Sequence, residues 1–235
     1  MKTKILNLIL IMSIIFGLYS CSCEKGSGKI TTIKRALTDF DEIEIDFPGK
    51  VILIQGEENS VSIISDDNLT ELVNTKVSRG NLKINLNECI KTFTQLEVTV
   101  TFKNLEQIEH KGLGNVEATN EIKSNKLKLI SKGSGAIKLN ISANAMKTEM
   151  SGQSEVKLSG RTSSNEIKIS GQGSMHAYDL ICNEIDIDLT NSGNANIFVT
   201  DKLDADLSGS GDIRYQGNPL KVNSNITGSG SIKTK

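Results

Sequence analysis

The sequence predicts an all-β protein, a right-handed β-helix-like solenoid with coils of about 19 residues and Gly-x-Gly turns. Two observations predict this class. Gly-x-Gly motifs, or near copies of them, recur seven times at a nearly constant interval, and the residues around each motif alternate between apolar and polar side chains. Alternation with a period of two indicates strands that bury one face. The interval is also too short for the ~40-residue blade of a propeller.

The repeated motifs mark the ends of the predicted coils. Their first positions are separated by 21, 19, 19, 20, 18 and 19 residues. These positions are Gly112, Gly133, Gly152, Gly171, Asn191, Gly209 and Gly228. Asn is the residue other than Gly that best tolerates a positive φ, so Asn191 predicts that the turns need this backbone conformation. The competing architecture is a β-sandwich or a meander of hairpins, which would use the two-residue Asn-Gly or Asp-Gly turns that the repeats lack.

Residues 1–20 have the pattern of a signal peptide of the lipoprotein type. Lys2 and Lys4 precede an apolar run that is shorter than the roughly 20 residues of a transmembrane helix. The Cys that follows, Cys21, resembles the modified residue of a bacterial lipobox, which implies cleavage before it and anchoring to a membrane through lipid on it. Ser22 in the next position resembles the sorting pattern of outer-membrane lipoproteins. An ordinary secretory signal is the alternative.

The rest of the chain is predicted to form a tether and one domain. Residues 21–29 are small and polar, so we expect a flexible tether. A continuous solenoid over residues 30–235 follows, with irregular coils over 30–105 and regular repeats over 106–235. Two separate domains that meet between these parts are the alternative. Within the irregular part, residues 66–73 carry capping residues and one turn of helical apolar spacing, which predicts a short helix or an extended loop.

The alternation assigns the inward side of each strand. In the irregular part, Ile43 and Ile45 alternate before Pro48-Gly49, and Val51 and Leu53 alternate after it. In the regular part, mostly apolar residues occupy the second and fourth positions before each turn and after it. The positions between them are mostly Lys, Glu, Asp, Ser and Asn. We therefore expect an apolar interior and a polar surface whose equivalent residues stack from coil to coil.

Five acidic residues form the candidate binding face. Glu166, Asp186 and Asp204 each lie five residues before a turn, and Asp188 and Asp206 each lie three residues before one. On stacked coils the four Asp side chains would point outward about 5 to 7 Å apart and repel one another unless a cation or Lys168 relieves them. We predict that this face binds Ca²⁺ or a cationic partner, with a hydrated acidic surface as the alternative. No other metal or cofactor is predicted.

The remaining charged residues argue against nucleic-acid binding, and the histidines and cysteines are expected to have structural or surface positions. With 27 basic and 28 acidic residues, the chain lacks the basic stripe with which nucleic-acid recognition begins, so no nucleic-acid partner is expected. His110 falls at an inward position and is predicted to be a core or coil-edge histidine, whereas His176 falls outward and is expected to be solvated. Cys89 and Cys182 are expected to form one disulfide in an oxidising compartment or to remain two buried thiols.

Three segments and the Gly-Ser-Gly-x-Ile turns carry a family resemblance over about residues 36–232. The segments are Phe40-Asp41-Glu42-Ile43, Val51-Ile52-Leu53-Ile54-Gln55-Gly56 and Gly80-Asn81-Leu82-Lys83-Ile84. In these features the chain resembles the head GIN domain of putative auto-transporter adhesins, a family of bacterial cell-envelope proteins that are often lipoproteins. The resemblance implies a β-helix-like fold, a surface location and an adhesin role, and it supplies no catalytic residues.

From these observations we expect a non-catalytic, lipid-anchored protein of the cell envelope, in the outer membrane and facing either the periplasm or the exterior. It would display a repetitive β-solenoid surface for adhesion or envelope interaction. Its expected partners are the membrane, through the lipid anchor, and a protein or glycan at the surface. The alternative is a glycan-binding or glycan-processing protein, such as a polysaccharide lyase or hydrolase, that uses the acidic face.

Overall fold

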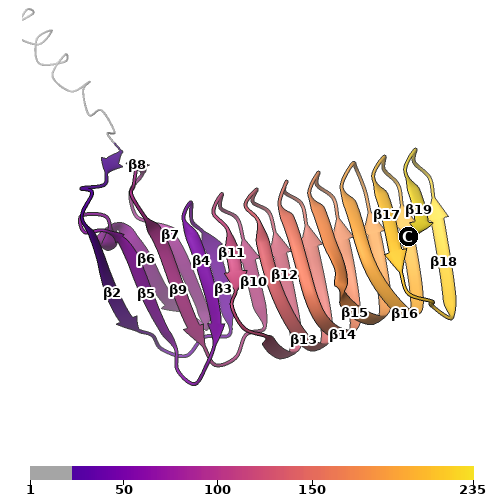
Figure 1. The fold of residues 1–235 in the computed structure, drawn as a ribbon, viewed down its shortest axis with the longest axis horizontal. Helices are drawn as coiled ribbons and strands as arrows, with labels where there is room; N and C mark the ends of the chain where they lie inside the picture. Colours follow the sequence, from indigo (N-terminus) through magenta and orange to yellow (C-terminus); the bar gives the residue numbers. More distant parts are fainter. Residues whose placement is uncertain (1–22) are drawn as a thin grey trace, which may run out of the picture.

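The computed structural model describes residues 23–235, and these residues wind into the predicted stack of β-coils (Figure 1). The predicted signal peptide over residues 1–20 and the lipidation site Cys21 lie outside the described residues. One short 3₁₀ helix, η2 (Thr70–Leu72), forms within the segment where a short helix or extended loop was expected. No helix within residues 23–235 has the length and apolar character needed to cross a bilayer.

Each regular coil is flattened, with one strand segment before the Gly-x-Gly turn and one after it. We call the surfaces that these segments form the pre-turn face and the post-turn face. The turns follow one long edge of the solenoid, and bends within the long strands follow the opposite edge (Figure 1). The strands of this part are β10 (Gln107–His110), β11 (Val116–Ala118), β12 (Ile122–Ser131), β13 (Ile137–Met150), β14 (Glu155–Ile169), β15 (Ser174–Leu189), β16 (Asn194–Leu207), β17 (Asp212–Gln216), β18 (Lys221–Ile226) and β19 (Ser231–Thr234).

The regular strands pair in parallel and almost in register, so equivalent residues form columns along the solenoid. Neighbouring strands lie about 4.8 Å apart. In one inward column of the post-turn face, five successive residues from β13 to β17 are all buried and apolar. They are Ile137, Val156, Met175, Ala195 and Ile213. Burial of such columns supplies the main driving force for stacking, and it confirms the inward positions that the alternation assigned.

The turn glycines allow the backbones of neighbouring coils to stack closely. The sequence-based expectation that these turns need a positive φ is therefore wrong. Asn191 does have a positive φ of 76°. Within residues 23–235, however, the glycines with positive φ all lie outside the Gly-x-Gly turns. A Cβ on Gly135 or Gly209 would instead run into the carbonyl oxygen of the residue below it, Gly114 or Asn191. The turns repeat glycine because a side chain would push neighbouring coils apart.

The N-terminal part closes one end of the stack, and its order in space differs from its order in the chain. β3 and β4 pair in parallel with β10 and β11, and β7 and β9 stack in parallel on the other side of them. β6, β5 and β2 then add antiparallel strands at the end. The strands are β1 (Glu24–Lys25), β2 (Ile30–Ala36), β3 (Glu42–Asp46), β4 (Lys50–Gln55), β5 (Ser60–Asp66), β6 (Val73–Ser78), β7 (Asn81–Leu86), β8 (Ile90–Thr92) and β9 (Leu96–Phe102).

Residues 23–29 are held against this N-terminal end, which differs from the flexible tether expected over residues 21–29. β1 pairs with β8 in a separate two-stranded sheet. The buried carboxylate of Asp66 accepts hydrogen bonds from the backbone N–H of Gly28 at 2.6 Å and of Thr94 at 2.8 Å. These contacts bind a small, polar segment whose composition alone indicates flexibility.

The disulfide joins Cys23 to Cys89 across 66 positions of the chain. Both arrangements considered from the sequence, a bridge between Cys89 and Cys182 or two buried thiols, are therefore wrong for Cys89. Cys182 remains a free thiol, buried inside the regular coils, and donates a hydrogen bond to the carbonyl oxygen of Glu184 at 3.1 Å. Burial raises the pKa of Cys182 to about 12, so this thiol stays protonated and unreactive.

Candidate functional site

The five acidic residues predicted from the sequence lie together on the outward side of the pre-turn face. β14, β15 and β16 pair so that Glu166 stands beside Asp186 and Asp186 beside Asp204. Asp188 stands beside Asp206 in the neighbouring outward column. The buried inward residues of the same strands fix this register, because a slip by one residue would turn the apolar side chains into solvent. The arrangement thus follows from the alternation in the sequence.

Two of the five carboxylates are paired with lysines. Glu166 lies 3.0 Å from Lys147 and 3.2 Å from Lys168, and the hydrogen bond from Lys147 is the main cause that lowers the pKa of Glu166. Lys202 pairs with Asp204 and lowers the pKa of that carboxyl. Both carboxylates are therefore ionised and neutralised by neighbours at physiological pH, and their pairs are exposed to solvent, where ion pairs contribute little stability.

Asp186, Asp188 and Asp206 have no ion-pair or hydrogen-bond partner among residues 23–235. Like charges on neighbouring strands repel one another, so these side chains create a negative surface field that attracts cations. Across the same residues, no three His, Cys, Asp or Glu side chains converge closely enough to hold a metal ion. Binding of Ca²⁺ by this face remains a prediction.

A hollow of about 520 Å³ adjoins the acidic residues on the pre-turn face. Its floor contains the side chains of Met146 and Ile185, both nearly buried. Its walls carry charges of both signs, and they include Lys126, Lys128, Lys147, Glu166, Glu184, Asp186, Lys202 and Asp204. This mixture suits a zwitterionic or polar partner better than a simple cation, because attraction and repulsion alternate along the walls.

The two histidines occupy the sides of the strands that the sequence predicted. His110 is fully buried, and its Nε2 lies 2.9 Å from the carbonyl oxygen of Gly114. Burial lowers the pKa of His110, so the ring is neutral in the core. His176 points outward and is half-exposed, with Nε2 3.7 Å from Glu155. Neither ring forms an acid and base pair with a carboxylate in a cleft.

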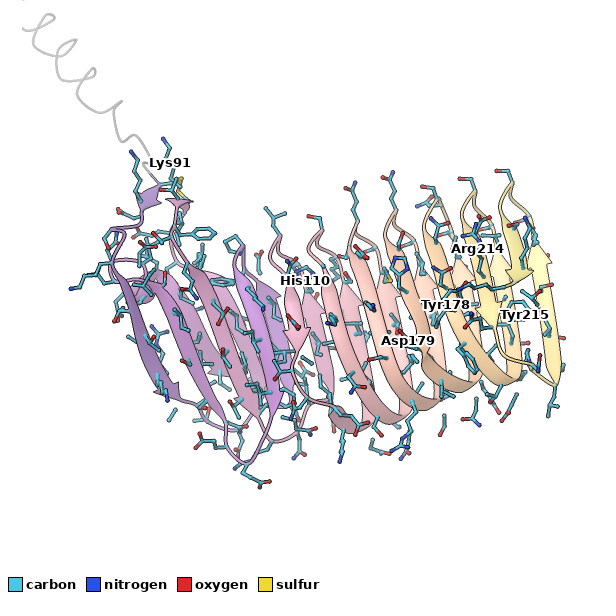
Figure 2. The ribbon with its side chains drawn as sticks, in the orientation of Figure 1. Lys91, His110, Tyr178, Asp179, Arg214 and Tyr215 are labelled. Carbon is cyan, nitrogen blue, oxygen red and sulfur yellow. A yellow bond between two sulfur atoms is a disulfide. The ribbon has the colours of Figure 1, made fainter. Side chains whose placement is uncertain are left out.

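The post-turn face carries a different set of outward residues in its C-terminal half. Lys157, His176 and Asn196 follow one another in a single column, and Arg214 is next to Asn196. A bulge in β15 presents Tyr178, and the ammonium group of Lys235 lies 4.5 Å from its ring centre. Figure 2 shows Tyr178 and Arg214 near one another, far from Lys91 at the projecting N-terminal tip. Charges of both signs also meet on this face, where Arg214 pairs with Asp212 at 2.6 Å.

The sequence did not point to a second hollow, which measures about 1150 Å³ and lies along the bends. Outward amides and hydroxyls line it at equivalent positions of successive coils. They are Asn125, Asn144, Ser163 and Asn183, spaced by 19, 19 and 20 residues. This repeat of polar residues at the bend positions is the signal that could have revealed the hollow.

Comparisons with known proteins agree on the fold. A family model described as "Putative auto-transporter adhesin, head GIN domain" matches residues 39–219. A crystal structure of a putative adhesin from Bacteroides fragilis is 23% identical with a TM-score of 0.84, over 90% of this chain and 100% of that one. Putative adhesins from Parabacteroides distasonis and Parabacteroides merdae are 24% and 25% identical, with TM-scores of 0.76 and 0.69. They cover 91% and 90% of this chain and 100% and 98% of their own. No curated protein matches the chain.

Proposed function

Because the chain belongs to the head GIN domain family of putative auto-transporter adhesins, we propose that it is a lipid-anchored protein of the outer membrane that presents its solenoid for adhesion. The family match over most of the chain is the observation that carries this proposal. The geometry supports it, because in-register strands repeat the same outward positions along the molecule and so offer an extended, stiff surface to a large partner.

The N-terminal features support a location in the cell envelope. The disulfide between Cys23 and Cys89 is a bond that persists in oxidising compartments and is rare in the cytosol. Cys23 stands two positions after Cys21, the residue we propose to carry the lipid. The disulfide would then fix the first described residues to the closed end of the solenoid, so that the lipid anchor holds this end at the membrane.

The proposed role is binding without catalysis, with a surface protein or glycan as the partner. Two side chains that could serve general acid–base catalysis are unsuited to it in their surroundings. His110 is buried and neutral, and Glu166 is paired with two lysines. The remaining acidic residues would contribute a field that attracts Ca²⁺ or cationic groups. Release of sugar fragments from an acidic polysaccharide by the purified protein would contradict the non-catalytic assignment.

Replacing Cys21 tests the anchor and the adhesion role together. In cells fed a labelled fatty acid, the wild-type protein should acquire the label and stay in the membrane fraction, whereas Cys21→Ser should lose both properties. Cys182→Ala, which removes a buried thiol in the coils, should keep both. Cells that carry Cys21→Ser should also adhere to their target surface as weakly as cells without the protein. Normal labelling of Cys21→Ser, or unchanged adhesion without the protein, would contradict the proposal.

A further inference from the structure

The hollow along the bends, here called the bend groove, spans several coils at the edge opposite the turns. It begins beside the loops that precede β3 and β10 and continues to β15. Within it, Lys123, Ser142, Arg161 and Ile181 occupy equivalent positions of successive coils. Since coils repeat every ~4.8 Å, Lys123 and Arg161 project into the same groove from backbone positions about 10 Å apart.

Charged residues of both signs line the bend groove. Asp39, Asp41 and Glu106 lie just before β3 and β10, where Lys103 is 3.8 Å from Asp39. Lys123 and Arg161, further along the groove, are available to a ligand. Arg161 has no carboxylate within ion-pair distance among residues 23–235, and its Nε donates only a long hydrogen bond of 3.5 Å to the hydroxyl of Ser142. Its planar fork of N–H donors fits a carboxylate at two points. The nearest carboxylate to Lys123 is Glu121 at 3.9 Å, and the Lys123 side chain is 75% exposed. Such a pair contributes little and is easily exchanged for a ligand carboxylate.

The amides of the bend groove complement sugar hydroxyl groups. The side-chain N–H of Asn144 donates to the side-chain oxygen Oδ1 of Asn125 at 2.8 Å. This bond orients both side chains, and it leaves N–H donors on Asn125 and the carbonyl oxygen of Asn144 free. Sugar hydroxyls both donate and accept hydrogen bonds, so a ladder with free groups of both kinds suits them. Ile181, 51% exposed in the same groove, offers an apolar contact for the C–H side of a sugar ring.

From this combination we propose that the bend groove binds an oligosaccharide that carries carboxylate groups. Arg161 and Lys123 bind carboxylates on successive sugar units, and the Asn125–Asn144 pair binds hydroxyls between them. A peptide strand is disfavoured, because the strands at the bends are already paired on both sides and present no free edge. Single-stranded nucleic acid is disfavoured, because the one aromatic residue of the groove, Phe40, is buried and unable to stack with a base.

This inference rests on the adhesion role proposed above. It names the partner as a carboxylated glycan and the binding surface as the bend groove. It assigns binding to the bend groove and leaves the acidic face outside it. A carboxylated glycan would be repelled by Asp186, Asp188 and Asp206 but attracted by Arg161 and Lys123 in the groove. The two surfaces therefore predict opposite ligand charges, which makes them separable by experiment.

Calorimetric titration of the purified full chain with trigalacturonate tests the inference. The free acid should bind, its fully methyl-esterified form should bind at least about tenfold more weakly, and added salt should weaken the binding of the acid. Arg161→Gln should lower affinity for the acid about tenfold, and Asn144→Ala should lower affinity for both forms. The matched control Arg214→Gln, on the post-turn face, should bind as the wild type does. Thermal unfolding of each variant verifies that it is folded.

Equal affinity for acid and ester, unchanged affinity in Arg161→Gln, or absence of measurable binding would overturn the inference. Equal or tighter binding of an oligoglutamate peptide or of single-stranded DNA would also overturn it, because it would show a site for polyanions in general. Failure of the adhesion role can be distinguished from failure of the groove assignment. If the purified chain binds trigalacturonate while cells adhere equally well without the protein, the groove assignment stands and the adhesion role falls. If adhesion needs the protein but trigalacturonate does not bind, the reverse holds.

Discussion

In the N-terminal cap, residues 23–102, strands β2, β5 and β6 run antiparallel to their neighbours, and a disulfide and a buried aspartate fasten the first described residues. In the regular coils, residues 107–234, all neighbouring strands pair in parallel, and glycine turns and apolar columns repeat. The cap depends on single, non-repeated contacts, whereas the coils depend on one contact made many times. The cap also replaces an open parallel edge with antiparallel strands, and open edges invite unwanted pairing.

The largest expected loss of stability comes from a substitution that breaks the repeated backbone contact of the coils. Gly135→Ala places a Cβ against the carbonyl oxygen of Gly114 and should lower the free energy of unfolding by about 4 kcal/mol. Ser134→Ala, one residue earlier at the exposed middle of the same turn, should change it by less than about 0.5 kcal/mol. Urea unfolding followed by circular dichroism measures both. Equal midpoints for the two variants would show that close backbone stacking is unimportant.

Removal of the disulfide should be the next largest effect and should be confined to the cap. Cys89→Ser opens a link between positions 66 residues apart and should cost about 3 kcal/mol, mainly through the entropy of the unfolded chain. Amide hydrogen exchange should quicken in β1, β2 and β8 and stay unchanged in β13 to β16. The wild type in reductant serves as the control and should show the same changes in exchange as Cys89→Ser. Faster exchange throughout the coils would show that the two regions are not independent.

The pH dependence of the cap should come from Asp66. The hydrogen bond from the Thr94 N–H is the main cause that lowers the pKa of Asp66 below its ordinary 3.8. A lowered pKa stabilises the fold fully above the unfolded value, and this contribution is lost as the pH falls through the folded value. Asp66→Asn should therefore lower Tm at pH 7 by a few degrees and match the wild type in strong acid. The exposed control Asp179→Asn should leave the profile unchanged, and the same profile in both variants would contradict this role.

The smallest effects concern the acidic face of the coils. Asp206→Asn removes one of several repelling carboxylates and should raise Tm by about 1 °C or less at low ionic strength. Glu166→Gln removes partners of Lys147 and Lys168 and should lower Tm by a similar amount. Both effects should vanish in high salt. If Tm shifted in the same direction in both variants, the difference between an unpaired Asp206 and a paired Glu166 would have no effect on stability, which would contradict this account.

The regular coils were more predictable than the cap because their contacts repeat in the sequence. The spacing of the turns and the alternation around them correctly placed Asp186 beside Asp204 and Asp188 beside Asp206. No local sequence pattern indicates which cysteine pairs with Cys23, because the disulfide to Cys89 depends on where the cap places β1 and β8.

The bend groove escaped prediction for a different reason. Alternation separates inward from outward residues along a strand, but it does not show where outward residues face a hollow. Arg161 and Asn144 were therefore indistinguishable from other surface residues until the bends brought them into one groove. The spacing located the glycine turns correctly, but the explanation by a positive φ was wrong, since close backbone approach at Gly135 explains their repetition.

The adhesion role requires that the coils face the outside of the cell. Treatment of intact cells with a membrane-impermeant amine reagent, followed by isolation of the protein, tests this directly, because exposed lysines such as Lys123 and Lys157 would react. We predict labelling of intact cells and loss of the labelled domain after external protease treatment. Labelling that appears only after the outer membrane is permeabilised would place the coils in the periplasm and contradict an adhesin at the cell surface.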